Sequence, residues 1–289
     1  MDLPMVDEID HKILMHRDAH FSGSFPLMIE YYKKKGKGVD RDLTIKRILE
    51  LAELEEKLKE NLSRLYLSHM EKKEVERARK KYLELRDVYE SGSKSAQIIS
   101  DLILTEKEDP FDEIEAAVSM SQETLPALLE LVSSNDFYSP LFPGYGTAPY
   151  AAATALGQIQ APLALNPLFE ALGRDDFFLE EIVLAALKEI PGAKEFLLKK
   201  LSHLPISKDN EKAVIALLQF TEESSIATEC LNLLKNQEVW KLPLFASYLI
   251  LGCSALDLSE RKVFLTLLSQ DNLPEELKKE MVLISKSWR

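Results

Sequence analysis

Apolar side chains recur along this chain with the spacing of an α-helix. Two long segments, Leu43 to Leu67 and Glu74 to Tyr89, carry an apolar residue at every third or fourth position, which gives one apolar face on a helix. No stretch of useful length alternates apolar and polar residues as a half-buried strand does. The pattern therefore predicts an all-α protein.

The two long segments are expected to form a helical hairpin. Only a short break at Ser68 to Lys72 separates them, and helices joined by a short break pack as antiparallel neighbours. Ser91-Gly92-Ser93 then gives the clearest boundary in the chain. We therefore expect an N-terminal hairpin or capping region at 1–92, followed by a second region at 93–289.

Within the second region, one pattern returns about every thirty residues. Its most regular feature is a pair of apolar residues, called here the anchor pair, with successive copies separated by 31, 30 and 33 positions: Ala155-Leu156, Ala186-Leu187, Ala216-Leu217 and Leu249-Ile250. A fixed period in this range is typical of stacked helix pairs. The repeat predicts a solenoid at 93–289 and not a single closed core.

The clearest copy resembles the short HEAT repeat of phycobilisome-lyase-like proteins. The residues that carry the likeness are Ala152, Ala155-Leu156-Gly157, Ile159, Ala164, Pro167-Leu168 and Ala171-Leu172. A fainter copy includes Ala185-Ala186-Leu187, Ile190, Gly192, Leu197-Leu198 and Leu201. The likeness covers roughly residues 110–289. It implies a right-handed α–α superhelix whose second helices line a concave face and hold another protein, without implying lyase chemistry.

Charge narrows the class of partner. The chain has 289 residues and a net charge of −12, yet residues 31–90 carry +4 and the remainder −16. Nucleic-acid binding depends on basic surfaces that neutralise phosphates, so acidic repeats argue against a nucleic-acid partner or DNA chemistry. A protein with a basic surface fits better.

Two uncharged stretches are candidates for membrane spans. Leu242 to Leu256 is about five residues too short to cross a bilayer, and Phe137 to Phe169 contains five prolines. The N-terminus is acidic and lacks the apolar region of a secretory signal. Cys230 and Cys253 lie in apolar helical patterns, as reduced buried thiols do. We expect a cytoplasmic protein without a membrane span.

Candidate partner-binding residues come from two places. The loop at 137–150 is rich in aromatics and prolines, and such side chains make good binding anchors when exposed; folding of the loop back onto the helices is an equal alternative. The predicted second helices supply polar positions. The expected contacts are Phe142, Tyr145, Asn166, Glu170, Glu195, Lys199, Glu229 and Asn232.

The remaining candidate chemistry is a histidine pair. His16 and His20 are four residues apart and therefore share one helix face, as two ligands of a divalent metal do. Asp18 or Glu30 could add a carboxylate. The same histidines also continue the apolar stripe of Ile9 and Ile13, so packing against the long hairpin with their ring nitrogens satisfied is the simpler explanation.

The leading hypothesis is a helical-repeat adaptor that binds another protein through its concave surface and its aromatic loop, without a cofactor and without enzymatic activity. The alternative is a metal-binding or catalytic N-terminal module centred on His16 and His20 and carried on the repeats. No nucleophile elbow and no dinucleotide-binding glycine turn supports other catalysis.

Overall fold

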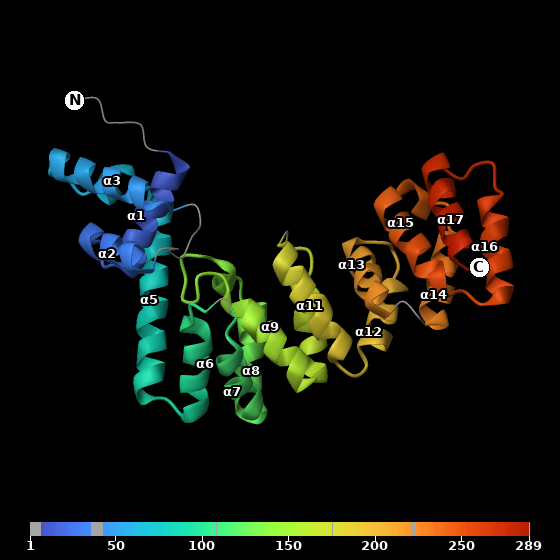
Figure 1. Ribbon diagram of the computed structural model, residues 1–289, viewed down its shortest axis with the longest axis horizontal. Coiled ribbons are helices and arrows are strands. Elements are labelled where there is room, and N and C mark those ends of the chain that lie inside the picture. The colour runs from blue at the N-terminus through green and yellow to red at the C-terminus, as the bar shows by residue number, and fades with distance from the viewer. Residues whose placement is uncertain (1–6, 36–42, 108, 175, 221–222, 289) are drawn as a thin grey trace. The chain divides into compact units, whose positions relative to one another are not determined.

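The computed structural model describes residues 7–35, 43–107, 109–174, 176–220 and 223–288, and in these ranges it contains helices, turns and no strand. The all-α prediction is confirmed. The chain forms two compact units, Met1–Ala155 and Leu156–Arg289, and Figure 1 traces the order of their helices along the chain. No helix among these residues is both long and apolar enough to cross a membrane.

The first unit begins with four helices packed around one apolar core. They are α1 (Glu8–His20), α2 (Phe25–Lys35), α3 (Ile45–Leu58) and α4 (Leu62–Tyr66). Asp7 caps α1 by accepting from the backbone N–H of Asp10, whose side chain accepts from Asp7 in return. The core is built from branched and aromatic side chains, among them Ile13, Leu14, Met28, Ile48, Leu51 and Leu62.

The predicted single helix at Leu43 to Leu67 is wrong, because it is broken into α3 and α4. Lys59 ends α3 in a left-handed conformation with φ +56°, and Asn61 caps α4 by accepting from the backbone of Arg64. A side-chain cap satisfies an N–H that a continuing helix would otherwise bond, so the two compete. α3 packs on α2, while α5 (His69–Ser91) packs on α1. The structure therefore differs from the expected two-helix hairpin.

The remaining helices of the first unit pack next to α5 through α6. They are α6 (Lys94–Leu104), α7 (Phe111–Ser119), α8 (Ser121–Ser133) and the short 3-10 helix η1 (Asn135–Tyr138), and α9 (Ala148–Ile159) crosses into the second unit. α6 packs on α5, α7 and α8. The boundary expected at 92–93 falls inside this unit, and the division into 1–92 and 93–289 stays a prediction.

The second unit contains α10 to α17 and four short 3-10 helices. Their bounds are η2 (Pro162–Ala164), α10 (Leu165–Ala171), α11 (Phe177–Glu189), α12 (Ala193–Leu201), α13 (Lys208–Leu217), η3 (Leu218–Phe220), α14 (Ser224–Leu234), η4 (Val239–Lys241), α15 (Pro243–Gly252), η5 (Cys253–Ala255), α16 (Leu258–Leu268) and α17 (Glu275–Ser287). α10, α11, α12 and α13 pack one on the next, α15 packs on α13, α14 and α17, and α16 packs on α17. The free thiols of Cys230 and Cys253 are buried, as the sequence predicts.

The four anchor pairs occupy equivalent places. They lie on α9, α11, α13 and α15, and every one of their eight side chains is buried. Between the first two, Gly157 allows a close approach: a Cβ there would lie 2.8 Å from Ala186 Cα. A larger side chain at this position would push α9 and α11 apart.

Candidate functional site

The predicted histidine pair lies on one face of α1. The rings of His16 and His20 stack with their centroids 5.0 Å apart and 18° between their planes. The carboxylates that could complete a metal site bond elsewhere: Asp18 accepts from Arg17 at 2.8 Å, and Glu30 from Lys34 at 2.5 Å. Nowhere in the described ranges do three or more His, Cys, Asp or Glu side chains form a group that could hold a metal ion. A metal at this pair stays a prediction, which elemental analysis of the untagged protein would test.

His20 lies inside a cluster of aromatic rings. Its ring centroid is 5.0 Å from that of Tyr82 on α5 and 5.0 Å from that of Tyr145 in the loop. Neither ring nitrogen of His20 makes a hydrogen bond to the described part of the chain. Burial lowers the pKa of His20 to about 3; repulsion from His16 adds to this shift and the Leu141 backbone opposes it. The imidazole is therefore neutral at physiological pH.

Tyrosine hydroxyl groups surround the same cluster. The Tyr82 hydroxyl interacts with that of Tyr145 and lies 3.5 Å from the Phe142 carbonyl oxygen, and the Tyr31 hydroxyl donates to the Glu106 carboxylate. Burial is the largest cause that raises the pKa of Tyr31, Tyr82 and Tyr145, and the charge of Glu106 adds to each shift. A neutral imidazole among protonated phenols has no activated nucleophile beside it. The cluster is suited to holding α1, α5 and the loop together.

The aromatic loop folds back against α5. Phe142 is only 4% exposed and packs with Leu141 on Val75 and Ala78, while Arg77 covers the ring at 5.3 Å. Phe142 therefore does not present an exposed binding anchor, and Tyr145 is half-buried against His20. Of the two alternatives for this loop, the structure has the one in which it folds back.

Glycine at the turn explains why the loop lies so close. Gly144 has φ +86°, and a Cβ on it would lie 2.8 Å from the Ile103 carbonyl oxygen on α6. Only a residue without a side chain fits this approach in the left-handed conformation. The sequence contains this signal, Pro143-Gly144-Tyr145-Gly146, but it does not say which helix the turn meets.

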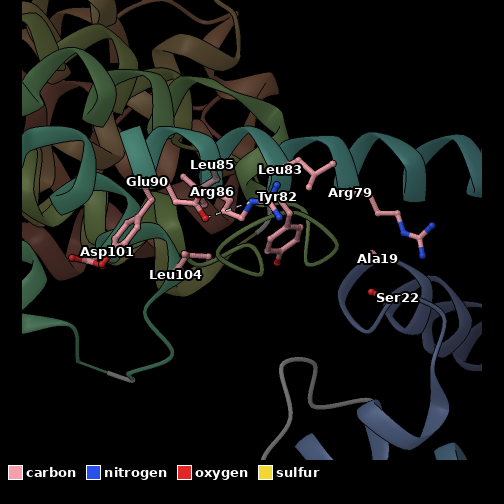
Figure 2. Close-up of a pocket in the computed structure, with 11 residues that line it drawn as sticks. Ala19, Ser22, Arg79, Tyr82, Leu83, Leu85, Arg86, Glu90, Asp101 and Leu104 are labelled. Atoms are coloured by element: carbon pink, nitrogen blue, oxygen red, sulfur yellow. Dashed lines mark ion pairs between the residues drawn. The ribbon is translucent and has the colours of Figure 1, made fainter. Parts of the chain in front are cut away.

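A groove of about 700 Å³ runs along α5 in the first unit. Figure 2 shows Arg79, Tyr82, Arg86 and Glu90 following one another along the helix, with Asp101 and Leu104 of α6 near its C-terminal end. Ala19 and Ser22 line the other end, and Leu83 flanks the row. The apolar periodicity of the sequence does not predict this groove. The sequence contains one signal for it, Leu83, an apolar residue beside the charged positions Lys81 and Glu84.

The other predicted contact residues lie on the surface of the second unit. Asn166 and Glu170 on α10, Glu195 and Lys199 on α12, and Asn232 on α14 are exposed, and Glu229 on α14 is half-buried. Polar contacts join these helices: Glu170 lies 3.8 Å from Lys200, and Ser202 donates to Glu229 at 2.7 Å. α10, α12 and α14 are thus linked in that order by side chains at their surfaces.

These features define an all-helical protein with a folded-back aromatic loop, an open groove and a polar row on alternate helices. No known protein family, curated protein or solved structure matches the chain.

Proposed function

We propose that this protein is a non-enzymatic helical-repeat scaffold that binds another protein. In this proposal the helix pairs stack as a right-handed α–α superhelix of the HEAT type, and the N-terminal helices cap one end. The four buried anchor pairs at near-equal spacing support it, as does the close approach of Gly157 to Ala186. When each repeat buries such a pair on its first helix, its second helix stays free to bind a partner protein.

The observation that carries the proposal is the exposure of polar side chains on alternate helices. On α10, α12 and α14, the residues expected to contact a partner are exposed or half-buried, and side-chain contacts join the three helices. Residues 156–289 contain 19 acidic and 15 basic side chains. A partner with a basic surface is the best electrostatic match. Since Phe142 is buried, the surface proposed here consists of helices alone.

The test begins with isolation of the partner by the full-length chain and continues with purified components. Replacing Glu170 and Glu195 together by lysine is expected to raise the dissociation constant about tenfold or more, which corresponds to about 1.4 kcal/mol. The loss arises because two attractions to a basic partner become repulsions.

Glu181 and Glu189 on α11 provide the matched control, because both are exposed acids on a first helix. Their double lysine variant should bind as the unaltered chain does, and circular dichroism should show both variants folded. Equal weakening by the two double variants, or none by either, would refute the proposed surface.

A further inference from the structure

The groove on α5 exposes apolar side chains to solvent, whereas the exposed side of a helix normally carries charged and polar residues. Leu83 is 50% exposed, Tyr89 43% and Leu104 43%. Tyr89 belongs to the row Arg79, Tyr82, Arg86 and Tyr89, whose spacing of three, four and three residues is that of one helix face, and Leu83 and Leu104 lie beside this row. A groove with exposed apolar side chains between charged ones is a surface that a second helix can cover.

The two ends of the groove carry opposite charges. At one end, the Arg79 Nε donates to the Asp18 carbonyl oxygen at 2.7 Å, and Arg79 makes no ion pair with any described residue. At the other end lie Glu90, which pairs with Arg86 at 3.9 Å, and Asp101 (Figure 2); Asp101 is exposed and has no ion-pair partner in the described ranges, so it carries the free negative charge of this end. Arg79 and Glu90 are eleven residues apart, or about 16 Å along the helix.

We propose that this groove is a self-complementary surface through which two copies of the chain associate, with their α5 helices antiparallel. In an interface with two-fold symmetry, every contact between two different residues occurs twice, once in each direction between the two copies. Antiparallel α5 helices bring Arg79 of one copy beside Glu90 and Asp101 of the other, and the same contact forms again at the opposite end.

The charge order selects this arrangement over a parallel one. In a parallel pair, Arg79 would face Arg79, and the acids would face each other, so repulsion would act at both ends. In the antiparallel pair, the apolar side chains Leu83, Tyr89 and Leu104 are covered by the partner helix. Burial of these apolar side chains supplies the association energy, and the charges determine that the two helices run antiparallel.

The experiment measures the molar mass of the full chain by sedimentation equilibrium between about 1 and about 100 μM. The unaltered chain is expected to pass from monomer to dimer in this range. Arg79→Asp and Asp101→Arg should each raise the dimer dissociation constant at least about tenfold, because each substitution creates two repulsive contacts. The double variant R79D/D101R reverses both charges in each copy and should recover the dimer.

The sharpest test mixes two variant chains and measures which dimers form. Chains with Arg79→Asp and chains with Asp101→Arg repel their own kind but attract each other at both ends, so native mass spectrometry should detect the mixed dimer in excess. The matched control mixes Lys73→Asp on α5 with Glu115→Arg on α7, two exposed positions outside the groove, and should give a statistical distribution. A chain that stays monomeric throughout, a groove filled instead by a different protein, or a statistical mixture of the two groove variants would overturn the proposal.

Discussion

Arg17 is unusual because its side chain is buried, whereas arginine side chains are normally exposed to solvent. It is fully buried, its guanidinium donates to Glu55 at 2.6 Å and to Ser63 at 2.8 Å, and it covers the ring of Phe25 at 4.5 Å. These contacts join α1 to α2, α3 and α4. The sequence does not reveal this role, because Arg17 stands beside the two histidines without any pattern that predicts burial.

Replacing Arg17 by methionine is expected to lower the free energy of unfolding of the first unit by about 3 kcal/mol, since removal of one member of a buried ion pair strands its partners. Urea unfolding should be followed by circular dichroism, because both tryptophans, Trp240 and Trp288, lie in the second unit. Arg64→Met is the control: Arg64 is exposed and its loss should change stability by less than about 0.5 kcal/mol. A loss of similar size in both variants would contradict the role assigned to Arg17.

His20 makes stability depend on pH in a defined direction. Its pKa is about 3 in the folded protein and 6.5 in the unfolded reference, so the unfolded state binds the proton more readily below pH 6.5. The stability contributed by the neutral ring is present above pH 6.5 and is lost as the pH falls toward 3. Between pH 6.5 and 5.0, His20 alone should lower the free energy of unfolding by roughly 1.5 kcal/mol.

The measurement is urea unfolding of the His20→Phe variant beside the unaltered protein over this pH range. Phenylalanine keeps an aromatic ring in the cluster and cannot titrate, so the variant should gain stability relative to the unaltered chain as the pH falls. His69→Phe, at an exposed histidine on α5, should show no such gain. Parallel pH profiles for His20→Phe and the unaltered protein would show that His20 is not the titrating group.

The sequence predicts where helices lie better than it predicts where they are interrupted. The spacing of apolar residues predicts α5 and α9 because that signal is local and repeated. The break between α3 and α4 was missed since it depends on competition between a continuing helix and the cap at Asn61. The same limit applies to the candidate site: the shared face of His16 and His20 follows from their spacing, but Tyr82 and Tyr145 reach them from far along the chain.

Helix contact in the second unit can be tested at Gly157. Replacement by alanine should lower the free energy of unfolding by about 1–3 kcal/mol, because the new methyl group meets Ala186 at a distance that the helices cannot accept without moving. This cost must exceed the gain of about 1 kcal/mol from better helix propensity. Tryptophan fluorescence reports this unit directly. Gln158→Ala, at the exposed neighbouring position, should be near neutral, and a stabilised Gly157→Ala variant would mean that α9 and α11 are not in close contact.

The whole molecule combines two compact units with different surfaces. The first unit holds the groove with exposed apolar side chains, and the second holds the polar row on α10, α12 and α14. Composition and periodicity predict the helical class and the buried anchor pairs. They do not predict the groove, because its lining comes from the end of α1, α5 and α6, whose contacts no local pattern encodes.

Hydrogen exchange of the full chain, alone and with the isolated partner, tests the proposed scaffold most directly. The account predicts that the partner slows exchange in α10, α12 and α14, with α11 and α13 unchanged, because the second helices form the binding surface. Slower exchange confined to α11 and α13, or no change anywhere in residues 156–289 while the partner is bound, would contradict it.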